Sequence, residues 1–123
     1  DGGGKSTVEF MSASHPIPLN RTDITEAHAL AAQYLGMKLV YLEAGSGAQT
    51  PVPTETIQTL SEKVDIPLIV GGGIRTPEDA EKRVHAGASF IVTGTVLETS
   101  GSSSLMQELA SAIHIKQRNK DDD

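Results

Sequence analysis

Three apolar runs in this sequence end in loops of glycine and small polar residues. The loops are Gly45-Ser46-Gly47, Gly71-Gly72-Gly73 and Gly94-Thr95. Backbone N–H groups that converge without an intervening side chain hold a phosphate dianion well, and glycine permits the close approach and positive φ angles that this needs. The agreement between neighbouring loops predicts a phosphate site. The alternative is that Gly71 to Gly73 form only a tight turn.

Glu43 is the one carboxylate in an otherwise apolar run, residues 39–43. An unpaired carboxylate in a closed core would be costly, so Glu43 should face a pocket that holds a partner. A ligand hydroxyl is one such partner, with Glu43 as acceptor or base. The alternative is a structural ion pair with Lys38, with Arg75 or with a residue outside this chain. Tyr41 shares the face of Glu43, and its phenol either joins the site or packs in the core.

Strands and helices must alternate to bring these loops together. Strands are expected over residues 37–43, 67–70 and 89–93, each an apolar run typical of a parallel strand buried on both faces. Alternation over residues 6–12 suggests one further strand. Because ligands of parallel α/β folds bind beyond the carboxyl ends of the strands, the three loops should meet at one edge.

Helices are expected between the strands. In the first, Asp23 is a candidate N-cap, Glu26 completes a capping box and Gly36 ends the helix. Its apolar stripe is expected to be Ile24, Ala27, Ala31 and Tyr34. His28 on this helix is interpreted as a surface residue, because no partner lies at metal-ligand spacing.

Three further helices complete the pattern. Residues 54–64 should bury Ile57, Leu60 and Val64. The next helix has Thr76 as N-cap and Pro77 at its first position, and it stops at Gly87. The last helix is capped by Ser102, Ser103 or Ser104. Its stripe is Leu105, Leu109 and Ile113.

This order indicates an α/β fold that makes up about half of a (β/α)8 TIM barrel. The 123 residues are too few for a whole barrel, which typically needs about 200 or more. We interpret residues 1–123 as one half-barrel of a single phosphate-binding domain. Because both edges of such a sheet would be unpaired, the missing half is expected as another segment.

Composition excludes several classes of protein. The net charge of −6 comes without a basic patch, so nucleic acid is not an expected partner. Cysteine is absent, which excludes disulfides and thiolate metal sites. No apolar segment approaches the roughly 18 residues that span a bilayer, and no signal peptide opens the chain. A cytoplasmic location is expected, although the chain starts at Asp1 without a methionine.

The Gly-Lys-Ser sequence at residues 4–6 is similar to the end of a phosphate-binding P-loop. That motif requires an earlier glycine, which would precede Asp1, and a helix after the lysine. Residues 7–11 are instead rich in strand formers, so a turn that leads into an extended segment is the favoured interpretation.

Four stretches closely resemble the C-terminal half of the geranylgeranylglyceryl phosphate synthase family, and together they cover nearly the whole chain. They are residues 15–40, 41–48 (YLEAGSGA), 67–80 (PLIVGGGIRTPEDA) and 85–98 (HAGASFIVTGTVLE). The resemblance implies a prenyltransferase of archaeal ether-lipid (phospholipid) biosynthesis. Such an enzyme joins the C3 hydroxyl of sn-glycerol 1-phosphate to geranylgeranyl diphosphate and releases diphosphate with the assistance of Mg2+.

The resemblance also implies roles for individual residues. Glu43 is the candidate catalytic residue, which would hold the glycerol hydroxyls and take the proton of the attacking one. The residues expected to bind sn-glycerol 1-phosphate are Tyr41, Leu42, Glu43, Ala44, Gly45, Ser46, Gly47, Gly72, Gly73, Gly94 and Thr95. The magnesium ligands of the family belong to the N-terminal half, so this chain alone should be inactive and hold no metal. Family members form dimers or hexamers, which makes a homo-oligomer the expected state.

Other functions stay open at this point. One is a different phosphate-binding barrel enzyme, such as a sugar-phosphate isomerase or a prenyltransferase of another chain length. A second is a half-barrel without catalytic activity that binds phosphate or serves in assembly.

Overall fold

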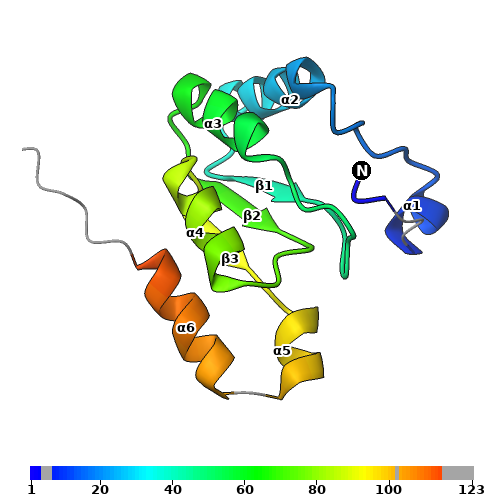
Figure 1. Cartoon of the computed structure of the whole chain (residues 1–123). Helices are drawn as coiled ribbons and strands as arrows, with labels where there is room; N and C mark the ends of the chain where they lie inside the picture. The colour runs from blue at the N-terminus through cyan, green and yellow to red at the C-terminus, as the bar shows by residue number, and fades with distance from the viewer. Residues whose placement is uncertain (4–6, 102, 115–123) are drawn as a thin grey trace, which may run out of the picture.

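The computed structural model describes residues 1–3, 7–101 and 103–114 of the chain (Figure 1). Three parallel strands form one sheet in the order β1-β2-β3. The strands are β1 (Val40–Glu43), β2 (Leu68–Gly71) and β3 (Phe90–Val92). The helices are α1 (Thr7–Ser12), α2 (Thr22–Tyr34), α3 (Thr54–Lys63), α4 (Pro77–His85), α5 (Thr95–Ser100) and α6 (Ser103–Ile113). Strands and helices alternate from β1 to α5, so the parallel α/β half-barrel architecture is confirmed.

The core lies between the sheet and the helices. Leu42, Leu68 and Val70 point from the strands into it, and Ile57 and Leu60 of α3 are completely buried there. Within the part of the chain that the structure describes, no helix is long and apolar enough to cross a membrane.

The opposite face of the sheet is open, which corrects the expectation that the strands are buried on both faces. Tyr41, Phe90 and Val92 point to this face and are 46%, 58% and 44% exposed. A parallel barrel strand buries its second face against the other strands of the barrel. Since β1 and β3 each pair on one side only, the strands that would cover this face are not part of the described sheet.

The strand expected over residues 6–12 is absent from its described part, residues 7–12, and that prediction was wrong. Residues 7–12 form helix α1, in which the Ser12 hydroxyl donates to the carbonyl oxygen of Val8 at 2.6 Å. Figure 1 shows α1 apart from the sheet, without a neighbouring strand to pair with. A helix therefore does follow the Gly-Lys-Ser sequence, as it does in a P-loop, although residues 7–11 are rich in strand formers. Residues 4–6 themselves lie outside the described residues.

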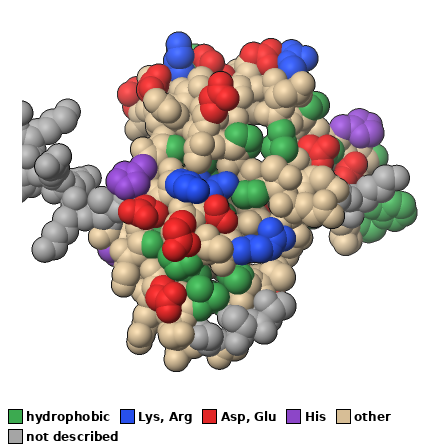
Figure 2. Space-filling model, in the orientation of Figure 1, with side chains coloured by type: hydrophobic (Ala, Val, Ile, Leu, Met, Phe, Trp, Pro, Cys, Tyr) green, Lys and Arg blue, Asp and Glu red, His purple; other side chains and the backbone are tan. Residues whose placement is uncertain are grey.

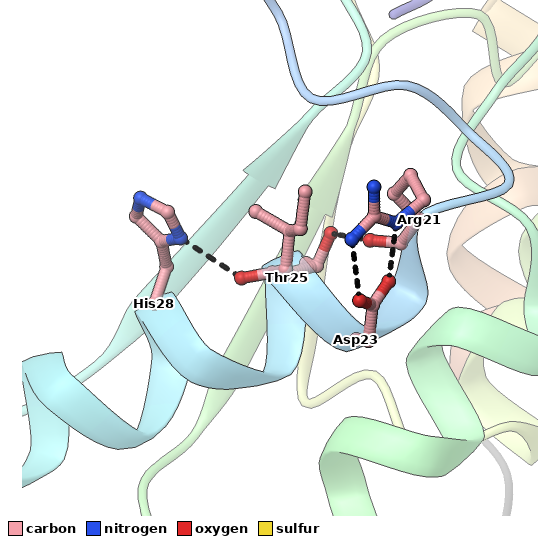
Figure 3. A network of polar contacts seen from close by, with 5 residues as sticks. Arg21, Asp23, Thr25 and His28 are labelled. Atoms are coloured by element: carbon pink, nitrogen blue, oxygen red, sulfur yellow. Dashed lines mark hydrogen bonds and ion pairs between the residues drawn. The ribbon is translucent and has the colours of Figure 1, made fainter.

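Helix α2 begins differently from the prediction. Arg21, not Asp23, precedes the helix, and its guanidinium pairs with the Asp23 carboxylate at 2.7 Å (Figure 3). The hydrogen bond from Arg21 is the main cause that lowers the pKa of Asp23 to about 2. The capping box was therefore wrong: Asp23 lies inside the first turn of α2, where its carboxylate binds the Arg21 guanidinium. Gly36 does follow the helix, with φ of +83°.

The apolar stripe predicted for α2 was also wrong. Ala29 is buried, whereas Ala27, Ala31 and Tyr34 are exposed. Helix α2 packs against α3, where the Thr22 and Thr56 hydroxyls lie 2.9 Å apart, and this contact sets which side of α2 is covered. His28 is exposed as expected, with Nδ1 2.8 Å from the carbonyl oxygen of Ile24 (Figure 3).

Helices α3, α4 and α6 follow the predictions, whereas α5 was not predicted. Ile57, Leu60 and Val64 face the core, and the Thr76 hydroxyl accepts a hydrogen bond from the N–H of Asp79 at 3.1 Å. Leu109 of α6 is buried against α4. Ser102, one of the proposed caps of this helix, lies outside the described residues.

Replacing Leu60 by alanine should destabilise the chain strongly. Leu60 is fully buried, so the substitution removes apolar contacts and leaves a cavity, at a cost of about 2–5 kcal/mol in the free energy of unfolding. Urea unfolding followed by circular dichroism measures this. Met106→Ala, at a 56% exposed position of α6, is the control and should change the free energy little. Equal effects of the two substitutions would contradict the assigned core.

Candidate functional site

The three predicted loops emerge at one end of the sheet. Glu43 lies in register with Gly71, and Gly71 with Val92, so the chain leaves all three strands at the same level. The N–H of Ala44 donates to the carbonyl oxygen of Gly71 at 3.1 Å and continues the pairing by one residue. The carboxyl end of the sheet is therefore where the candidate residues meet.

Tyr41 and Glu43 lie side by side on the open face of the sheet, above Gly71. A Cβ atom placed on Gly71 would lie 2.6 Å from the Tyr41 hydroxyl and 3.1 Å from Oε2 of Glu43. The other carboxylate oxygen, Oε1, accepts a hydrogen bond from the N–H of Gly45 at 2.8 Å. The Glu43 carboxylate is thus held near the strand ends and faces away from the core.

The phenol of Tyr41 belongs to this arrangement. Partial burial, followed by a hydrogen bond to Glu43, raises the pKa of Tyr41 to about 12. The phenol therefore keeps its proton at neutral pH and can donate it in a hydrogen bond to the carboxylate. The hydroxyl is directed to Glu43, not to a partner in the core.

Arg75 connects the loop after β1 to the loop after β2. Its guanidinium donates to the carbonyl oxygens of Ala48 at 2.8 Å, Gly47 at 3.3 Å and Gly73 at 3.4 Å. Among the described residues, no ion pair joins Glu43 to Lys38 or Arg75. Sequence reasoning considered Arg75 only as an ion-pair partner and missed this role, because no residue pattern signals a guanidinium that binds carbonyl oxygens.

Two glycines at this edge are required by conformation and by space. Gly72 and Gly73 have φ angles of +81° and +72°, which favour glycine. A Cβ at Gly72 would lie 2.5 Å from Oε1 of Glu43 and 2.6 Å from the carbonyl oxygen of Gly45. A Cβ at Gly73 would lie 2.8 Å from the carbonyl oxygen of Ala48. The two loops therefore touch through backbone that only glycine allows.

The other candidates lie around this centre. Gly94 is two residues beyond the last paired residue of β3, as Gly73 is for β2, and Thr95 begins α5. Ser46 and Gly47 are exposed at the tip of the first loop. Leu42 points into the core and is 7% exposed, so only its backbone can face a ligand. The structure thus brings Tyr41, Glu43, Gly45 and Gly72 into direct contact and places the rest of the set around them.

A metal centre is not formed here by the chain's own acidic and histidine side chains. No group of three or more His, Asp or Glu residues lies together in the described ranges. Glu43 instead accepts a hydrogen bond from the Gly45 N–H and lies beside the Tyr41 hydroxyl.

Arg75→Ala should loosen the contact between the two loops. The substitution removes hydrogen bonds to three carbonyl oxygens, each contributing on the order of 1 kcal/mol. The N–H of Ala48, which is bonded to the carbonyl oxygen of Gly45 at 3.0 Å, should then exchange with solvent about fivefold faster or more. Arg21→Ala, which breaks an exposed ion pair far along the chain, is the control. Unchanged exchange at Ala48 would contradict the connecting role of Arg75.

The sequence of this chain is similar to those of known proteins. The model of the PcrB family matches residues 4–113. The geranylgeranylglyceryl phosphate synthase of Thermococcus gammatolerans is 57% identical over 96 residues, which cover 78% of this chain and 38% of that protein. The protein of the same name from Chitinophaga pinensis is 43% identical over 114 residues, or 93% of this chain and 44% of the relative. The chain thus spans less than half the length of these relatives.

Solved structures agree on the fold. The (S)-3-O-geranylgeranylglyceryl phosphate synthase of Thermoplasma acidophilum, crystallised in complex with its substrate sn-glycerol-1-phosphate, superposes with a TM-score of 0.81 at 42% identity. That match covers 87% of this chain and 44% of the other. The described fold therefore corresponds to part of that enzyme.

Proposed function

Because the chain belongs to the PcrB family, we propose that it carries the sn-glycerol 1-phosphate site of a prenyltransferase, a geranylgeranylglyceryl phosphate synthase. The whole protein would join the C3 hydroxyl of sn-glycerol 1-phosphate to geranylgeranyl diphosphate in ether-lipid biosynthesis. The observation that carries the proposal is the meeting of the Glu43 carboxylate with the glycine loops of β1 and β2. The complex of the Thermoplasma acidophilum relative with sn-glycerol-1-phosphate supports the choice of substrate.

The phosphate would bind at the glycine loops. The proposed donors are the Ser46 hydroxyl and the backbone N–H groups at positions 46–47, 72–73 and 94–95. The Gly45 N–H instead donates to Glu43 at the edge of the same site. Backbone N–H and hydroxyl donors hold an anion without a cationic side chain, and the positive φ angles at Gly72 and Gly73 are of the kind that a phosphate-binding loop uses. The glycerol hydroxyls would then extend toward Glu43 and Tyr41.

Glu43 would act as the general base. As the C3 oxygen attacks the first carbon of the prenyl chain, the new ether bond forms and the bond to diphosphate breaks. Glu43 would take the hydroxyl proton, and diphosphate would leave with the bonding electron pair. The Gly45 N–H and the Tyr41 hydroxyl keep the carboxylate directed toward the open face of the sheet.

Mg2+ remains part of the proposal, but the described residues do not fit a site for it. When bound, the ion would offset the charge that develops on the leaving diphosphate. We place its ligands in the N-terminal half of the barrel, which would also cover Tyr41, Phe90 and Val92 on the open face of the sheet. Residues 1–123 would then be one half of a single domain, inactive alone.

We also propose a location and an assembly state for the enzyme from the family resemblance. A cytoplasmic location and a homodimer or homohexamer are the states that we expect. On the face in view in Figure 2, acidic side chains are interspersed with basic ones and no patch of Lys and Arg gathers. That face offers no surface of the kind that binds nucleic acid.

An assay of the full-length protein tests the proposal. With Mg2+ and geranylgeranyl diphosphate, sn-glycerol 1-phosphate should yield the ether, whereas sn-glycerol 3-phosphate should react far more slowly. Equal rates with the two enantiomers, or no ether from either, would refute the proposed activity. Turnover of a sugar phosphate in place of glycerol phosphate would favour an isomerase.

A further inference from the structure

We propose that Gly71 is a positioning residue for Glu43, because the lack of a side chain at this position lets the Tyr41 hydroxyl and the Glu43 carboxylate come together above β2. Gly71 is buried and lies directly beside Glu43 in the sheet register. Both polar groups lie within 3.1 Å of the place where its Cβ would be. The pairing itself is a feature of the structure, whereas its use in catalysis rests on the proposed function.

The requirement for glycine at position 71 differs from that at its two neighbours. Gly72 and Gly73 have positive φ angles, whereas Gly71 does not, so its backbone would accept alanine. Among the atoms nearest to its Cβ position, none belongs to the backbone: they are the Tyr41 hydroxyl, Oε2 of Glu43 and a ring carbon of Tyr41. The position is therefore restricted by the two side chains above it and not by the conformation of the strand.

An alanine methyl group should displace the phenol. In the 123-residue chain the Tyr41 side chain is 46% exposed on the open face, so its ring can move away from Gly71 while β2 stays in place. In the full-length protein the ring would move within the site that the other half of the barrel covers. The Glu43 carboxylate would then keep its hydrogen bond from the Gly45 N–H and lose the Tyr41 hydroxyl as its neighbour. We expect Gly71→Ala to fold normally and to separate Tyr41 from Glu43.

Ionisation of the phenol reports this separation. The chain has two tyrosines and no tryptophan, so in a Tyr34→Phe background the tyrosinate absorbance near 295 nm belongs to Tyr41 alone. With its pKa at about 12, Tyr41 should be about one-tenth ionised at pH 11. In Gly71→Ala the midpoint should fall by about one pH unit or more, a roughly tenfold change, so that about half of the phenol is ionised at pH 11.

Matched variants separate this effect from a general loss of structure. Gly94→Ala is the control for the titration, because a Cβ at Gly94 meets no atom within 4 Å, and it should leave the Tyr41 midpoint unchanged. Circular dichroism at pH 7 and pH 11 checks the fold. If Gly71→Ala unfolds but Gly71→Ala/Tyr41→Phe folds, the methyl group clashes with the phenol as proposed. If both unfold, or if the folded variant keeps the native midpoint, the proposal is overturned.

Steady-state kinetics of the full-length protein test the positioning role. Gly71→Ala should lower kcat about tenfold and change the KM for sn-glycerol 1-phosphate less than threefold, because the phosphate loops stay intact. In a Tyr41→Phe background, by contrast, adding Gly71→Ala should change kcat little, because the phenol is already absent. A shifted titration with native kcat would overturn the role in catalysis. If the native protein makes no ether at all, the proposed function fails, and the titration still decides whether Gly71 holds the pair together.

Discussion

Glu43→Gln is expected to reduce ether formation by the full-length protein by about 100-fold or more. Glutamine keeps the size of the side chain and can still accept the hydrogen bond from the Gly45 N–H. It cannot take a proton at neutral pH, so the attacking hydroxyl would lose its base. The measurement is single-turnover formation of geranylgeranylglyceryl phosphate at saturating substrates, where weaker binding does not affect the rate.

A second Glu→Gln substitution, at Glu55, is the control for Glu43→Gln. Glu55 is an exposed carboxylate in the first turn of α3 and is not one of the candidate site residues, so Glu55→Gln makes the same chemical change without altering that set. We expect native turnover from this variant. Turnover close to native in Glu43→Gln, with the Glu55 control also native, would show that Glu43 is not the base.

Gly73→Val should lower the affinity for sn-glycerol 1-phosphate by at least about tenfold. Valine is strongly disfavoured at a φ of +72°, and its Cβ would lie 2.8 Å from the carbonyl oxygen of Ala48. Backbone strain of this kind costs on the order of 1–3 kcal/mol, and relief of the clash would move the loop after β1 away from the loop after β2. Isothermal titration calorimetry with sn-glycerol 1-phosphate measures the affinity.

Gly36 offers a matched comparison for this experiment. Its φ is +83°, yet a Cβ there meets no atom within 4 Å, and it lies at the end of α2. Gly36→Val therefore introduces similar backbone strain without moving the glycine loops. It should lower the melting temperature while keeping the native affinity. If both variants bind as the native chain does, the phosphate does not use the loop at Gly73.

Much of the fold could be predicted because local signals and burial agree. The apolar spacing of Ile57, Leu60 and Val64 and the Thr76 cap gave α3 and α4 correctly. The failures occur where a contact outside the predicted pattern decides the outcome. Arg21 takes the carboxylate expected to cap α2, and residues 7–12 become helical because they have no strand beside them.

In the candidate site, too, some residues could be found from local sequence features and others could not. The glycine loops and Glu43 could be found from the sequence, because strand ends and a carboxylate in an apolar run are local features. Gly71 and Arg75 could not be assigned, since the role of Gly71 depends on two side chains of a neighbouring strand and that of Arg75 on carbonyl oxygens 27 and 28 residues away. Cross-strand register and backbone acceptors leave no residue pattern to detect.

A crystal structure with bound sn-glycerol 1-phosphate tests the central claim most directly. We predict that the phosphate lies against the backbone of Gly72, Gly73 and Gly94, with a glycerol hydroxyl within hydrogen-bond distance of the Glu43 carboxylate. A phosphate bound elsewhere on the chain, or a glycerol directed away from Glu43, would contradict it.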